Sequence, residues 1–172
     1  MVGLAAVATG ALGACITQVA QYEVAPNTPP SVETPDSISP HSPLNRIVRL
    51  SDLTMADGGV GSGDLVLDAL VRDANLDQVL HYRLFLNYTP GSSPIRDNDI
   101  PPTGVLERRV TITLAAADLS ARACNRIELL VTSEAWPSAA RPRDPAEPGD
   151  VGTATWFVVR DDTVSLGDCR PW

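Results

Sequence analysis

Few residues of this chain have the type and spacing that catalysis needs. Of its two histidines, His41 lies in a proline-rich stretch and His81 falls on the outer face of an expected strand, so neither is positioned as a general base. The sequence has no G-x-S-x-G or H-E-x-x-H motif, and all 13 basic residues are arginine, which removes every chemistry that depends on lysine. We therefore predict that the protein is not an enzyme.

One acidic stretch has the residue types of a calcium site. Asp97, Asn98 and Asp99 offer hard oxygen ligands, which calcium prefers. Calcium needs about six to eight oxygens, so other segments would have to contribute. Asp and Asn beside proline are also ordinary turn formers, and this is the interpretation that we favour. We expect no metal and no cofactor.

A partner-binding site is more plausible in the stretch from Glu134 to Gly152, which has no strand pattern. Trp136, Arg141 and Arg143 are of the residue types that anchor protein interfaces. Prolines in the same stretch reduce the entropy that is lost when a loop becomes ordered. We hypothesise that this stretch is a binding loop. The alternative is that Trp136 closes the core below its strand.

Alternation of apolar and polar residues predicts the strands that position these side chains. In one segment Leu80, Tyr82 and Leu84 form one face, with His81 and Arg83 opposite. Expected strands span 46–53, 64–72, 79–88, 105–114, 125–134 and 154–161. The prolines fall between these segments, so we predict loops at 90–102 and 137–148, and only 115–123 looks helical, as a short connector.

These patterns predict an all-β fold, an antiparallel sandwich of about seven strands. Apolar residues make up 44% of the chain, enough for a packed core. The order of the strands resembles immunoglobulin-like and fibronectin-type modules, in pattern only. The second expected strand has no cysteine, the third has no tryptophan, and Arg122 stands where a corner tyrosine would be sought. A jelly roll or a small barrel remains the alternative.

The first fourteen residues are uncharged and apolar, with the length of the apolar region of a secretory signal. They end in Leu12-Gly13-Ala14-Cys15, which resembles the lipobox of bacterial lipoproteins. The resemblance implies that Cys15 carries a lipid and that the chain is cut just before it. Because Ile16 replaces the aspartate that retains such proteins in the inner membrane, the resemblance implies a place in the outer membrane.

This N-terminal segment departs from the family because no Lys or Arg precedes the apolar run. Either translation starts further upstream or the export signal is weak. Two alternatives to the lipoprotein are an ordinary cleaved signal and a buried N-terminal strand. We predict a signal peptide at 1–14, the lipid-bearing cysteine with a proline-rich tether at 15–45, and the sandwich at 46–172. Within the tether, Ser31 to Ile38 is the candidate for a first edge strand.

The two remaining cysteines are candidates for a disulfide, since exported proteins form such bonds. Cys124 begins the penultimate expected strand, and Cys169 follows the last one. If those strands are antiparallel neighbours, the two cysteines meet at one end of the sheet. The alternative is two free thiols, one of them buried.

Charge narrows the class of partner. The net charge of −8 argues against nucleic acid, because no basic patch is available to neutralise phosphates. Our leading hypothesis is a non-catalytic envelope lipoprotein, held at the membrane by its lipid, whose sandwich binds another envelope protein. The alternative is a surface module that binds carbohydrate or calcium.

Overall fold

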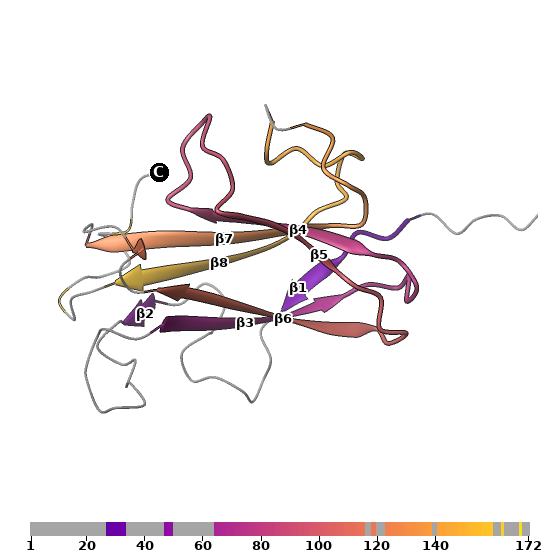
Figure 1. Cartoon of the computed structure of the whole chain (residues 1–172), viewed down its shortest axis with the longest axis horizontal. Coiled ribbons are helices and arrows are strands. Elements are labelled where there is room, and N and C mark those ends of the chain that lie inside the picture. Colours follow the sequence, from indigo (N-terminus) through magenta and orange to yellow (C-terminus); the bar gives the residue numbers. More distant parts are fainter. Residues whose placement is uncertain are drawn as a thin grey trace, which may run out of the picture.

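The computed structural model describes residues 27–33, 47–49, 64–115, 118–119, 123–138, 141–159, 163 and 169. The predictions for Cys15 and His41 lie outside this range. The described residues form eight strands in two sheets, stacked face to face (Figure 1). No helix is present in these ranges, and so none that is long and apolar enough to cross a membrane.

The first sheet has three antiparallel strands in the order β1-β3-β6: β1 (Ser31–Glu33), β3 (Asp64–Arg72) and β6 (Glu107–Ala115). The second sheet has the order β2-β8-β7-β4-β5: β2 (Ile47–Arg49), β8 (Gly152–Val159), β7 (Cys124–Thr132), β4 (Leu80–Leu86) and β5 (Arg96–Ile100). All neighbours in it are antiparallel except β2 and β8, which run parallel.

This connectivity is immunoglobulin-like. Strands β3 and β6 occupy the places of strands B and E, while β8-β7-β4-β5 follows the G-F-C-C′ order of variable-type domains. The predicted sandwich is therefore confirmed. The parallel β2–β8 pair was not foreseen, and Ser31–Glu33 pairs with β3, as the edge-strand alternative proposed.

The prediction of a loop over 90–102 was wrong in one part, because this segment contains β5. Strand β5 pairs with β4 alone and forms the edge of its sheet, with only Ile100 of its five residues buried. Hydrophobic alternation marks strands that bury one face, so a solvent-exposed edge strand does not produce the pattern.

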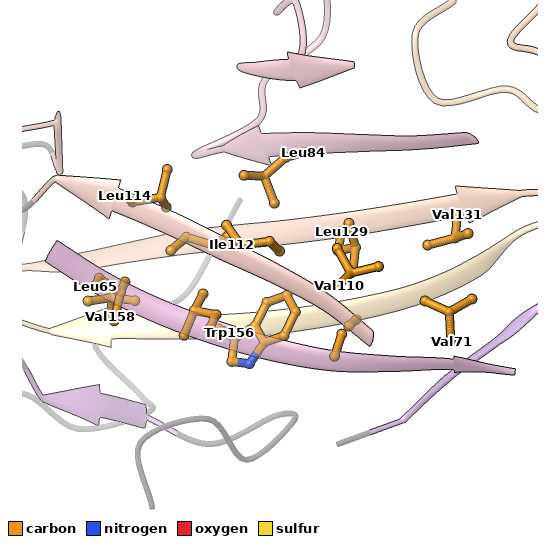
Figure 2. Close-up of a cluster of buried hydrophobic side chains, with 14 of the residues drawn as sticks. Leu65, Val71, Leu84, Val110, Ile112, Leu114, Leu129, Val131, Trp156 and Val158 are labelled. Atoms are coloured by element: carbon orange, nitrogen blue, oxygen red, sulfur yellow. The ribbon is translucent and has the colours of Figure 1, made fainter. Parts of the chain in front are cut away.

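The core lies between the two sheets and is built by the alternating residues of the predicted strands. Figure 2 shows side chains of β3 and β6 facing those of β7 and β8, with the indole of Trp156 among them. Trp156, Leu65, Leu129 and Val71 are completely buried. Burial of each such side chain contributes about 1.5–3 kcal/mol to the free energy of folding, which makes this layer the main source of stability.

The structure joins Cys124 and Cys169 in a disulfide, with Cα atoms 5.3 Å apart, as predicted. Cys124 pairs in register with Val159, so β7 and β8 are the antiparallel neighbours that the pairing required. Both cysteines are buried in a small cluster with Val159, against which Phe157 packs. The bond therefore fastens Cys169 to the second sheet.

Candidate functional site

The segment 133–151, which joins β7 to β8, contacts the outer face of the second sheet. Its Arg143 binds Glu128 of β7 through two hydrogen bonds, from Nη1 to Oε2 at 3.0 Å and from Nη2 to Oε1 at 2.9 Å. The guanidinium also lies 4.6 Å from the ring centre of Tyr88. Because Glu128 is only 4% exposed, its carboxylate has little contact with water, and Arg143 provides the opposite charge that it needs.

Arg83 of β4 also binds this loop through hydrogen bonds. Its Nη1 donates to the carbonyl oxygens of Pro142 at 3.1 Å and Ser138 at 3.4 Å, and its Nε donates to Asp97 at 2.9 Å. Its guanidinium carbon lies 4.9 Å from the Trp136 ring. Two of the three predicted binding residues, Trp136 and Arg143, are thus in contact with their own domain.

Arg141 differs from its two neighbours because its side chain is 77% exposed, with Asp144 at 3.9 Å as an ion-pair partner. Whether the three residues bind a partner stays a prediction. The sequence did contain a sign of the folded-back loop. Glu128 interrupts the apolar run from Ile127 to Val131, and a charge within a buried strand requires a partner of opposite charge.

The acidic stretch that resembled a calcium site has another role. Asp97 binds Arg83, and Oδ1 of Asp99 lies 2.6 Å from Nδ1 of His81. Asn98 points to the opposite face of β5 and donates to the Tyr82 hydroxyl at 3.2 Å, since successive residues of a strand alternate. The three side chains therefore do not converge on one ion. Within the described ranges, no three His, Cys, Asp or Glu residues are grouped to hold a metal.

An exposed ion-pair cluster lies on the first sheet. The carboxylates of Glu107 and Glu33 raise the pKa of the Arg72 guanidinium, chiefly through the hydrogen bond from Arg72 Nε to Glu107 at 2.8 Å. The ion pairs of Arg72 with Glu33, at 2.9 Å, and with Glu107, at 2.6 Å, join the three strands of this sheet.

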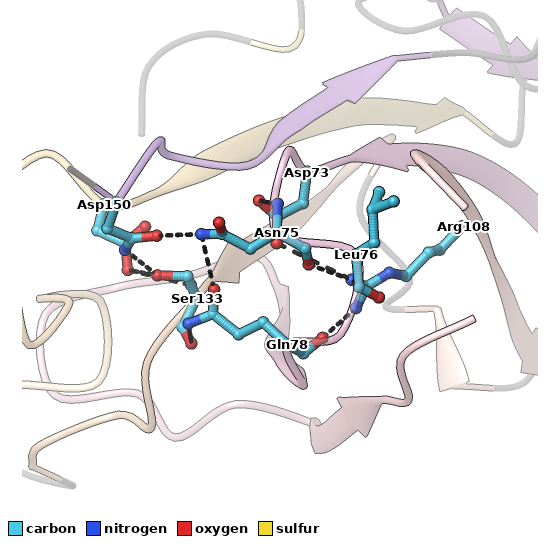
Figure 3. Close-up of polar contacts among 8 residues, drawn as sticks. Asp73, Asn75, Leu76, Gln78, Arg108, Ser133 and Asp150 are labelled. Atoms are coloured by element: carbon cyan, nitrogen blue, oxygen red, sulfur yellow. Dashed lines mark hydrogen bonds and ion pairs between the residues drawn. The ribbon is translucent and has the colours of Figure 1, made fainter. Parts of the chain in front are cut away.

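A surface better suited to binding a partner lies where the β3–β4 loop and the β7–β8 loop meet. We call the surface formed by Asn27 and residues 73–79, 133–134 and 147–150 the loop end. Beneath it, the guanidinium of Arg108 is buried and donates to the backbone carbonyls of Asn75, Leu76 and Gln78 (Figure 3). Asp73, also buried, accepts from the backbone N–H of Asn75 at 3.1 Å. These bonds fix the β3–β4 loop.

Further hydrogen bonds tie the segments of the loop end together. Gln78 Nε2 donates to the Ser133 carbonyl at 2.8 Å, and Asn75 Nδ2 donates to Asn27 Oδ1 at 3.0 Å. Asn27 in turn donates to the Ser133 hydroxyl. Asp150 Oδ2 accepts from the hydroxyls of Thr132 at 2.8 Å and Ser133 at 2.7 Å and from the Ser133 N–H at 3.0 Å. These hydrogen bonds join the segments of the loop end to one another.

Two adjoining hollows lie on this surface and share Asn27 and Glu134. The larger, of about 730 Å³, is lined by Asn27, Ala74, Asn75, Leu76, Asp77, Gln78 and Glu134. The smaller, of about 410 Å³, is lined by Asn27, Pro29, Glu134, Glu147, Pro148, Gly149 and Asp150. Every charged residue in these linings is acidic. The predicted binding stretch contributes Glu134 and residues 147–150 to these linings. Sequence reasoning missed Asn27, Pro29 and residues 74–78, because they are distant in the chain and have no motif of their own.

Comparison with known proteins adds little. No protein family model matches the chain, and no curated protein matches it. A solved structure that resembles it is the CARDB domain of a Pyrococcus furiosus protein, in complex with di-metal ions, with 12% identity and a TM-score of 0.40. The likeness covers 77% of this chain and 93% of that one. A likeness of this size gives no basis for assigning metal ions to the present chain.

Proposed function

We propose that this chain is a non-catalytic lipoprotein of the cell envelope whose immunoglobulin-like domain binds a protein partner through the loop end. The observation that carries the proposal is the ordered surface on which the β3–β4 and β7–β8 loops meet. In variable immunoglobulin domains the corresponding B–C and F–G loops lie at one end and form the binding site. Hydrogen bonds that fix these loops in advance reduce the entropy lost on binding.

The chemistry of the described residues supports a binding role over catalysis. Cys124 and Cys169 are joined in the disulfide, so neither is a nucleophile. His81 binds Asp99 at the edge of the second sheet, on the face opposite to the core. A general base needs a nucleophile or substrate proton within hydrogen-bond reach, and in the described part of the chain the imidazole of His81 is paired with a carboxylate, not with a hydroxyl or thiol.

The membrane part of the proposal rests on Leu12-Gly13-Ala14-Cys15 at the end of the apolar run. A lipid on Cys15 would hold the domain at the envelope, in the outer membrane where the cell has one. Mass spectrometry of the mature N-terminus tests this. We expect an acylated Cys15 as the first residue and an unprocessed chain for the matched variant Cys15→Ala. A mature wild-type chain without lipid on Cys15 would refute the anchor.

Site-specific photo-cross-linking in cells tests the binding surface. A photoreactive residue replaces Ala74, which lines the larger hollow, and in a control it replaces Val66, which is exposed on the outer face of β3. We expect a discrete cross-linked protein from position 74 and none from position 66. Equal products from both positions, or none from either, would count against the loop end as the binding surface.

A further inference from the structure

We propose that the loop end takes a basic segment of a protein, an extended run with several arginine or lysine side chains that lies across both hollows. This inference deepens the proposed function and rests on it. It concerns the chemistry of the partner, for which the charges around the hollows and one buried carboxylate give two independent arguments.

The first argument is the sign and state of the charges. Asp77 lines the larger hollow, Glu147 lines the smaller, and Glu134 lies where they meet. None of these three carboxylates has an ion-pair partner in the described part of the chain, unlike Asp97, Asp99 and Glu128 elsewhere on the domain. Such a surface attracts cations and repels anionic ligands, and complementary charge steers the encounter of two proteins.

The second argument is Asp150, a residue that lines the smaller hollow although it is only 4% exposed. Its Oδ2 accepts three hydrogen bonds, whereas its Oδ1 is buried and has no partner. A buried carboxylate oxygen without a donor is unfavourable, so a hydrogen-bond donor that reached this atom through the smaller hollow would be stabilised there. A guanidinium or ammonium group supplies a donor and a positive charge in one side chain.

The carboxylates are spread over the surface, and this spacing favours cationic side chains over a bare metal ion as the ligand. Calcium draws its oxygens into one shell of about 2.3–2.6 Å, and no such group of three acidic or histidine side chains exists within the described residues. An extended peptide needs no convergence, because each of its charges meets a different carboxylate. Leu76, which is 38% exposed in the larger hollow, offers an apolar surface for the long methylene stem of arginine or lysine.

Binding of a labelled peptide to the full chain tests the inference. The probe is a fluorescein-labelled dodecapeptide of alternating lysine and serine, and the test variant combines Asp77→Asn, Glu134→Gln and Glu147→Gln. Exposed ion pairs each contribute modestly, so we expect the three together to weaken binding about tenfold at low salt. The difference should shrink as salt screens the charges.

A variant with the same change in net charge is the control for non-specific attraction. It combines Asp64→Asn, Glu107→Gln and Asp118→Asn, three exposed carboxylates outside the loop end. We expect it to bind the peptide within about twofold of the wild-type chain. Equal weakening in both triple variants would mean that net charge alone attracts the peptide, and the inference would be overturned.

Zero-length carbodiimide cross-linking locates the bound peptide. Because the chain has no lysine, it forms no internal lysine–carboxylate cross-link, so every lysine amide found on one of its carboxylates comes from the probe. We expect such bonds at Asp77, Glu134 and Glu147. Bonds concentrated elsewhere, or calorimetry that shows Ca²⁺ binding at the loop end without peptide, would refute a basic ligand. A cellular cross-link from position 74 that survives in the loop-end triple variant would refute it too, while leaving the proposed function intact.

Discussion

Replacing Arg143 with alanine should release the 133–151 segment from the second sheet. The variant leaves Glu128, a residue that is 4% exposed, without its two hydrogen bonds from Arg143. Removing one partner of a fully buried ion pair costs about 3–5 kcal/mol, whereas an exposed pair contributes about 0–1 kcal/mol. The Arg143 side chain is 29% exposed, and Arg126 remains on Glu128, so the loss lies between these limits.

We expect Arg143→Ala to lower the free energy of unfolding by about 2–3 kcal/mol, including about 0.5–1 kcal/mol from the lost contact with Tyr88. Chemical denaturation measures this value. Hydrogen exchange should quicken across 133–151 and hardly change in β3. The matched control is Arg141→Ala, whose side chain is 77% exposed, and which should stay within about 0.5 kcal/mol of the wild-type chain.

A double-mutant cycle with Glu128→Gln isolates the pair. Because the two residues form one hydrogen-bonded unit, we expect a coupling energy of about 1–2 kcal/mol. Additive effects, together with unchanged hydrogen exchange in the loop, would refute the view that this ion pair holds the segment. Trp136 and Arg143 would then be free to serve as the binding residues that the sequence suggested.

Three further predictions concern the stability of the domain, and denaturant unfolding measures the free energy in each case. The double variant Cys124→Ala with Cys169→Ala opens a 45-residue loop, which should cost about 4 kcal/mol; a loss below about 1 kcal/mol would contradict the bond's structural role. Gly152→Ala places a Cβ 2.3 Å from the Pro30 carbonyl oxygen, so we expect a loss of about 1–3 kcal/mol, and an unchanged stability would show that residue 30 does not pack there. Arg108→Met removes the donors for three loop carbonyls and should cost about 3 kcal/mol, with faster exchange confined to 73–79; protection left intact would contradict its role.

The central strands of the sandwich could be predicted because each of them buries one face. Alternation located β3, β4 and β7 to within two residues, and the places of Cys124 and Cys169 relative to these strands indicated their bond. Alternation fails where burial does not follow the strand period. Strand β5 is exposed, and Phe85 is completely buried on the outer side of β4 because a distant loop covers it.

The stretch from Glu134 to Gly152 was predicted to bind a partner, but the rest of the candidate site could not be predicted because no local rule selects its residues. Asn27, Gln78 and Ser133 are common polar residues, and their importance comes only from being brought together across the fold. Asp150 lies in a Pro-Gly-Asp turn that resembles any surface turn. Only the structure reveals that it is buried, with one oxygen satisfied and the other without a donor.

In the loop end, the exposed carboxylates lie on loops that hydrogen bonds hold in place, and this arrangement indicates how the surface would bind a partner. Hydrogen bonds at Arg108 and Asp150 hold the loops, while Glu134 and Glu147 stay exposed on the rim. Exposed charges raise the rate of association more than the affinity, so the loop end is suited to rapid and salt-sensitive binding. A lipid on Cys15, about 12 residues before Asn27, would keep the domain within about 40 Å of the membrane. The anchor would thereby raise the effective concentration of a partner in the same membrane, and modest affinity would suffice.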